Sequence, residues 1–153
     1  MGSYIHYKNK FFFYSYDITK LENLINQELL FFCAMERHAK VDGKVIVGLT
    51  EKVSFVSSNG NKEVTAKVDT GATRSSIDTK LASKLNLGPV IKSKIIKSAH
   101  GNALRPIVEA EIVMAGKKMR SEFTLADRTH MKYSVLIGVN TLENRFLVDP
   151  SRK

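Results

Sequence analysis

An apolar, strand-like run leads directly into an acid, a hydroxyl residue and a glycine at Val68, Asp69, Thr70, Gly71 and Ala72. A carboxylate held at a strand end by a tight loop can take up and release a proton, and glycine permits the close turn that such a loop needs. Thr70 can hydrogen-bond backbone groups of the loop, and the small Ala72 leaves room for a facing chain. Taken alone, the triplet is also typical of an ordinary Asx turn after a strand.

A second segment, about 65 residues later, changes the weight of these alternatives. Residues 135–137 (Val-Leu-Ile) form a wholly apolar run, followed by Gly138 and by residues 139–142, which resemble a short helical turn. Between the two segments, Ser98–Arg105 is typical of a hairpin. A buried strand with a glycine at its end suits a chain that passes close to another loop.

Together these stretches resemble the retropepsin-like aspartic protease family. They are most similar to the members often called ATP-dependent zinc proteases, some of which are associated with ATP-grasp glutamate ligases. The matching segments are AKVDTGATRSSID, the pair Arg105-Pro106, LADRTHMKYSVLIG and FLVDPS. The resemblance covers about residues 44–151 and does not extend to residues 1–40.

The resemblance implies a small closed β-barrel of the retropepsin (acid protease) type that acts as a homodimer. Each chain would supply one catalytic carboxylate, Asp69, and the two carboxylates would share a proton across the subunit interface. The ionised one would take a proton from water while the protonated one polarises the scissile carbonyl, without a covalent intermediate.

The same resemblance assigns roles to further residues. The active-site loop would be Thr70, Gly71, Ala72 and Thr73, supported by Ile137 and Gly138, and the flap tip would be Ala99, His100, Gly101 and Asn102. Arg74, Arg105 and Arg128 are candidates for contacts with substrate. Arg74 is equally suited to a dimer salt bridge or a solvated face, and the other two arginines to structural pairing with a buried acid.

Neither a catalytic metal nor a nucleotide is expected. A zinc protease of the His-Glu-x-x-His type needs two histidines one helical turn apart, and His6, His38, His100 and His130 show no such spacing. Asp127 and His130 form only a weak candidate ligand pair. The sequence contains no GxxxxGK[ST] motif, so we expect no ATP site and no cofactor.

Composition limits the remaining classes. The 153 residues are 43% apolar and 25% charged, which is typical of a globular chain of one domain, or of one domain plus an extension. The single cysteine, Cys33, excludes a disulfide framework and favours the cytoplasm. No apolar run is long enough to span a bilayer, and no secretory signal is expected at the N-terminus.

Charge separates the two parts of the chain. Residues 1–40 carry a net charge of +1 and residues 41–153 carry +8, out of +9 in total. The basic second part predicts an anionic partner. Nucleic acid is disfavoured because the lysines are scattered and lack interleaved aromatic residues, whereas an acidic peptide, such as a glutamate-rich tail, fits the resemblance to proteins associated with glutamate ligases.

Periodicity predicts a partly helical extension at residues 1–40, with a helix at Asp17–Met35, and a mainly β domain at residues 41–153. The predicted strands are Val45–Leu49, Lys52–Ser57, Glu63–Val68, Val90–Ser98, Leu104–Met114, Lys118–Leu125, Val135–Ile137 and Phe146–Val148. A short helix is predicted at Asp78–Leu85. This pattern favours a small barrel from about Val45 to Val148.

The sequence therefore predicts an aspartic endopeptidase that acts on peptides or proteins. The alternative is a dimeric peptide-binding module of the same fold with little turnover. The intact Asp69-Thr70-Gly71 triplet favours the enzyme, because a binding module would have no need of the carboxylate.

Overall fold

A computed structural model describes residues 39–57, 60–98 and 101–152 of the chain. The predicted helix at Asp17–Met35 and two of the four predicted flap-tip residues, Ala99 and His100, lie outside these ranges. In the described part, no helix has both the length and the apolar character needed to cross a membrane.

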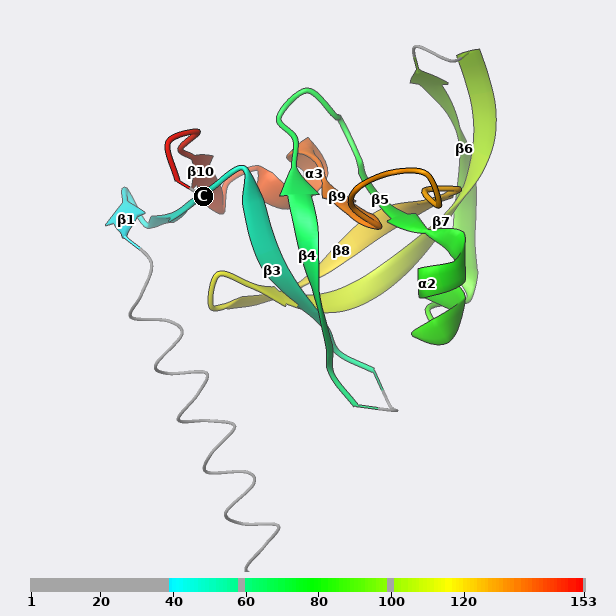
Figure 1. Ribbon diagram of the computed structural model, residues 1–153, viewed down its shortest axis with the longest axis horizontal. Coiled ribbons are helices and arrows are strands. Elements are labelled where there is room, and N and C mark those ends of the chain that lie inside the picture. The colour runs from blue at the N-terminus through cyan, green and yellow to red at the C-terminus, as the bar shows by residue number, and fades with distance from the viewer. Residues whose placement is uncertain (1–38, 58–59, 99–100, 153) are drawn as a thin grey trace, which may run out of the picture.

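A closed ring of six strands forms the centre of the described fold (Figure 1). In ring order, the strands are β3 (Thr50–Phe55), β4 (Lys62–Val68), β9 (Val135–Ile137), β5 (Ser75–Asp78), β8 (Lys117–Ala126) and β7 (Gly101–Met114). Antiparallel pairing between β7 and β3 closes the ring. The pairs β4–β9 and β5–β8 are parallel, and the others are antiparallel. The prediction of a mainly β, closed barrel is confirmed.

Other elements extend from this ring. β6 (Val90–Ser98) pairs with the first half of β7, and the resulting β6–β7 hairpin projects beyond the barrel (Figure 1). A small separate sheet contains β1 (Lys40–Val41), β2 (Lys44–Val47) and β10 (Phe146–Val148). The two helices within the described residues are short, α2 (Thr79–Lys84) and α3 (Val139–Leu142), as predicted.

Alternating apolar residues fill the inside of the barrel. The aromatic rings of Phe55 and Phe123 are fully buried, with their centroids 5.5 Å apart and a tilt of 54°, a favourable geometry for aromatic pairs. Ile77, Ile112 and Ile137 are also fully buried. Burial of such side chains provides most of the driving force for folding, so the strand ends that hold the polar residues are anchored in a packed core.

The sequence prediction missed one strand of the barrel and began another too late. β5 (Ser75–Asp78) was not predicted, because its two serines give it no apolar pattern, yet all four of its residues are buried. Strand β7 begins at Gly101 and not at Leu104, and Ser98 pairs with Gly101. Gly101 and Asn102 are thus already part of the strand, and Gly101 has a φ of +104°, which favours glycine.

Candidate active site

Asp69 lies at the point where β4 leaves the barrel. The preceding Val68 is buried, whereas Asp69 is half-buried. The Asp69 N–H donates to the carbonyl of Ile137 at 2.9 Å, which extends the parallel β4–β9 pairing by one residue. The backbone of Asp69 is therefore fixed by the strand that the sequence assigned to its support.

The loop after Asp69 folds back on the carboxylate itself. The Gly71 N–H donates to Asp69 Oδ1 at 2.9 Å, and the Ala72 N–H donates to the Asp69 carbonyl at 3.3 Å. Thr70 and Thr73 are exposed, and the Thr70 hydroxyl has no hydrogen-bond partner within the described residues. In one protomer the loop is thus closed by backbone N–H groups, and not by the Thr70 side chain.

Gly138 packs directly against this loop, which we call the Asp69 loop (residues 69–74). A Cβ at Gly138 would lie 2.5 Å from the carbonyl carbon of Arg74 and 2.7 Å from the carbonyl oxygen of Ala72. The N–H groups of Val139 and Asn140 donate to the carbonyls of Ala72 (2.8 Å) and Thr73 (3.2 Å). The β9–α3 segment therefore forms a backbone scaffold for the Asp69 loop.

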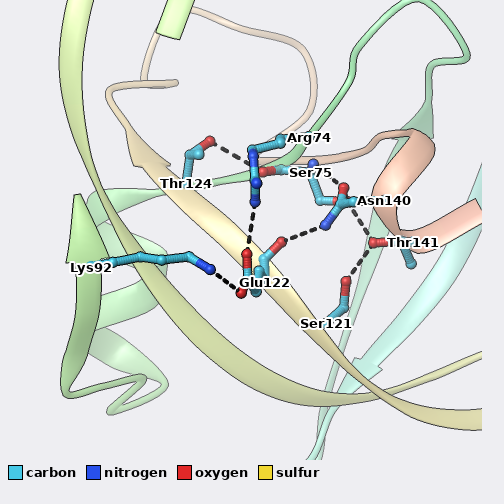
Figure 2. Close-up of polar contacts among 8 residues, drawn as sticks. All are labelled: Arg74, Ser75, Lys92, Ser121, Glu122, Thr124, Asn140 and Thr141. Carbon is cyan, nitrogen blue, oxygen red and sulfur yellow. Dashed lines mark hydrogen bonds and ion pairs between the residues drawn. The ribbon is translucent and has the colours of Figure 1, made fainter. Parts of the chain in front are cut away.

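A buried hydroxyl network lies beneath this scaffold (Figure 2). Ser75 Oγ accepts the Gly138 N–H at 3.0 Å and lies 2.6 Å from Thr141 Oγ1, which in turn lies 2.5 Å from Ser121 Oγ. The Asn140 side chain accepts the Ser75 N–H at 2.6 Å. A buried network in which each polar group has a partner fixes one arrangement of the segments that it joins, here β5, directly after the Asp69 loop, β8 and α3.

Sequence reasoning did not identify the network residues Ser75, Ser121, Asn140 and Thr141. One signal was available: a polar residue, Asn140, stands two positions after the glycine of the strand-glycine pattern. The Ser75 and Ser121 contacts involve residues 66 and 20 positions away from Thr141, and sequence spacing gives no indication of such distant partners.

Arg74 is engaged within its own chain. Its guanidinium lies 2.7 Å from the carboxylate of Glu122 on β8, and both side chains are largely shielded from solvent, with exposed fractions of 25% and 31%. The sequence suggested a substrate contact, a dimer salt bridge or a solvated face for Arg74, whereas within the protomer this arginine forms an intramolecular ion pair.

Arg128 is anchored just beyond β8. Its Nε donates to the carbonyl of Tyr133 at 3.0 Å, and its guanidinium donates to Ser76 Oγ at 3.1 Å. Burial lowers the pKa of Arg128, and so does the positive charge of Arg105, whereas Asp78 and Asp69 act in the opposite direction. Arg128 therefore lies within electrostatic range of both Arg105 and Asp69.

Asp78 is a structural acid. Its Oδ1 accepts the N–H groups of Lys80 and Leu81 as the N-cap of α2, and its Oδ2 accepts the Arg128 N–H at 2.9 Å. Both oxygens are occupied, so Asp78 is a poor candidate for the second carboxylate of a catalytic pair. The helix thus begins at Thr79, with Asp78 as its cap.

These bonds give Asp78 a pH-dependent effect on stability. The Arg128 N–H, with those of Leu81 and Lys80, holds the pKa of Asp78 below its ordinary value of 3.8. A lowered folded-state pKa stabilises the fold above the unfolded value, and this contribution is lost as the pH falls through the folded value. The contribution of Asp78 is therefore complete at neutral pH and declines below about pH 4.

We expect Asp78→Ala to lower the free energy of unfolding at pH 7 by about 2–4 kcal/mol, through loss of a helix cap and an unsatisfied Arg128 N–H. Urea unfolding between pH 3 and pH 7 measures this, and the difference from wild type should shrink below pH 4. Asp149→Ala is the control, because within the described residues the Asp149 carboxylate accepts hydrogen bonds from the Ser151 N–H and hydroxyl alone. Equal losses in the two variants would contradict the assignment.

The weak zinc candidates do not gather other ligands. Asp127 is exposed, and its Oδ1 accepts the N–H and the hydroxyl of Thr129 at 3.0 Å and 2.6 Å. These bonds lower the pKa of Asp127 and are typical of a local Asx turn. Within the described ranges, no three His, Cys, Asp or Glu side chains lie close enough together to hold a metal ion.

Residues 78–153 match a family model described as RimB-like, retropepsin-like aspartic endopeptidase RimB. The matched range begins nine residues after Asp69 and includes Arg105, Arg128 and Gly138.

Two curated relatives are similar over most of the barrel. The chain is 29% identical to a probable alpha-L-glutamate ligase of Shewanella pealeana and 30% identical to one of Shewanella halifaxensis, each over 140 residues. Each match covers 72% of this chain and 29% of the relative, so the chain spans less than a third of the length of these relatives.

A solved structure is similar in fold. EIAV protease in complex with the inhibitor HBY-793 superposes with a TM-score of 0.52 at 21% identity, covering 65% of this chain and 91% of the protease. The family predicted from the sequence is thus confirmed: residues 78–153 carry the RimB-like pattern of the retropepsin-like aspartic endopeptidases, on a barrel with the fold of a retroviral protease.

Proposed function

We propose that this chain is an aspartic endopeptidase whose catalytic residue is Asp69. The observation that carries the proposal is the half-buried Asp69 carboxylate at the end of β4, held by the Gly71 N–H and by the β9–α3 scaffold around Gly138. The retropepsin-like family match and fold support this assignment.

The proposed reaction needs a second carboxylate. In the described protomer the buried acid Asp78 is occupied by three N–H groups. We therefore propose an isologous homodimer in which the two Asp69 carboxylates meet at the two-fold axis and share one proton. The ionised member removes a proton from water, and the protonated member hydrogen-bonds the scissile carbonyl.

An acidic peptide is the proposed substrate class. Arg105 and Arg128 are half-buried, and Asp69 is among the charges that act on Arg128, so positive charge lies within electrostatic range of the proposed reaction centre. The matched relatives are named as glutamate ligases, which suggests glutamate-rich peptides for this chain. The charge of +8 on residues 41–153 would also attract such peptides over a distance.

Digestion of a peptide library by the purified chain tests the proposal. Cleavage within acidic sequences is the expected outcome. Binding of the same peptides without cleavage would instead favour the dimeric peptide-binding module, and cleavage that ignores acidic residues would remove the substrate proposal alone.

The dimer makes a separate prediction. If each active site needs Asp69 from two chains, activity per chain falls on dilution below the dissociation constant of the dimer, because the monomer has half a site. We expect initial rates to depend on the square of the protein concentration in that range. Light scattering over the same concentrations provides the oligomeric state, and strict proportionality between rate and concentration in a purely monomeric sample would contradict the shared site.

A further inference from the structure

Glu122 on β8 receives ion pairs from two separate parts of the chain. Its Oε2 lies 2.7 Å from the guanidinium of Arg74, and its Oε1 lies 2.5 Å from Lys92 Nζ. Figure 2 shows the carboxylate between the two cations, which approach it from different elements. Paired with both, Glu122 has a lowered pKa, with the Lys92 bond as the largest cause.

The Arg74 side of this arrangement reaches the Asp69 loop. Arg74 ends the loop, five residues after Asp69, and its carbonyl packs against Gly138. The backbone carbonyl of Glu122 also accepts the side-chain amide of Asn140 at 3.0 Å, and the Asn140 N–H donates to Thr73 in the loop. Glu122 therefore contacts the loop and its scaffold through both its side chain and its main chain.

The Lys92 side reaches the β6–β7 hairpin. β6 lies at the edge of the sheet and pairs only with β7 in the described sheet. Its pairing is irregular between Val90 and Lys92, and from Lys92 onward it follows a regular register toward Ser98. The Lys92–Glu122 ion pair thus gives the base of the hairpin a second attachment to the barrel, at the start of its regular part.

We propose that Glu122 is a positioning residue that fixes the Asp69 loop and joins it to the base of the β6–β7 hairpin. Arg74 transmits this restraint to the loop, and Lys92 transmits it to the base of the hairpin. The restraint itself rests on these contacts alone, whereas its effect on turnover rests on the proposed function.

Hydrogen exchange tests the restraint without any substrate. Lys92→Met removes a cation whose ion pair is with Glu122 and not with the Asp69 loop, and it should accelerate amide exchange in a peptide covering residues 69–75 by about tenfold through more frequent local opening. Lys92→Arg keeps the ion pair and should restore wild-type exchange. Unchanged exchange in Lys92→Met would overturn the link between hairpin and loop.

Enzyme kinetics provide the second test, and a matched control residue lies on the neighbouring strand β7. Glu111, on β7, pairs with Lys118 at 2.7 Å and is as exposed as Glu122, at 32% against 31%. Glu122→Gln should lower kcat by about ten- to a hundredfold, as expected for a displaced catalytic group, with little change in KM. Glu111→Gln should keep the wild-type kcat.

The two proposals fail in different ways. If the wild type cleaves peptides and Glu122→Gln has the same kcat as Glu111→Gln, Glu122 is not a positioning residue, although the endopeptidase stands. If the wild type cleaves nothing, the proposed function fails, while faster exchange of residues 69–75 in Lys92→Met and its rescue by Lys92→Arg still support the restraint.

Discussion

Asp69→Asn is expected to abolish peptide cleavage, with a loss of about a thousandfold or more, as expected when a group that transfers protons is removed. Asparagine has nearly the same volume and keeps an oxygen that can accept the Gly71 N–H, so the loop should retain its shape. What it lacks is an ionisable oxygen that can take a proton from water.

The measurement is cleavage of a peptide substrate, with thermal unfolding recorded on the same samples. Asp149→Asn is the control, because this acid lies in the turn after β10 and bonds with Ser151, and it should cleave at the wild-type rate. A chelator should leave the wild-type activity intact. Full activity in Asp69→Asn, or loss with the chelator and recovery with zinc alone, would refute the aspartic mechanism and direct attention to Asp127 and His130.

Gly138→Ala is expected to lower the free energy of unfolding strongly. Its added methyl group would lie 2.5 Å from the Arg74 carbonyl carbon and 2.7 Å from the carbonyl oxygens of Ala72 and Arg74. These are backbone atoms, so relief requires the Asp69 loop and the β9–α3 segment to separate. Overpacking that moves the backbone typically costs about 1–3 kcal/mol and occasionally more. We expect this variant to lose about 3 kcal/mol or more, because its contacts are with backbone atoms and because the Gly138 N–H bond to Ser75 is strained as well.

Urea unfolding compares this variant with Gly71→Ala on the facing loop. Among the described residues other than its chain neighbours, a methyl group at Gly71 would have one atom within 4 Å, Asp69 Oδ1 at 3.3 Å. The change in the free energy of unfolding should therefore be below about 1 kcal/mol. If Gly138→Ala unfolds at the wild-type urea concentration, the close approach of the two loops is not a requirement of the fold.

The elements with apolar patterns could be predicted from the sequence. β6, β9, α3 and β10 have the predicted bounds, because each is marked by apolar alternation, by a short apolar run or by a glycine. β5 was missed because Ser75 and Ser76 are buried through hydrogen bonds and not through apolar side chains. Tertiary partners determine such a strand, and local composition does not reveal them.

The site shows the same division. Asp69 and Gly138 could be proposed from sequence because each follows an apolar strand, and the motif is local. Glu122 could not, because it lies 48 residues from Arg74 and 30 from Lys92, and an acid in an alternating strand is usually only solvated. For Arg74, the sequence left three roles open. Its ion-pair partner within the protomer, Glu122, can be identified only from the fold.

The parallel pairing of β4 with β9 has a consequence for the order of folding. Val68 pairs with Ile137, and Val47 in β2 pairs with Val148 in β10, so both contacts join segments that are far apart in the sequence. Bringing distant segments together costs chain entropy before any contact repays it, and chains rich in such contacts fold slowly. The strands that hold Asp69 thus depend on long-range closure, and we expect the proposed catalytic loop to form late, after local hairpins such as β3–β4 and β7–β8.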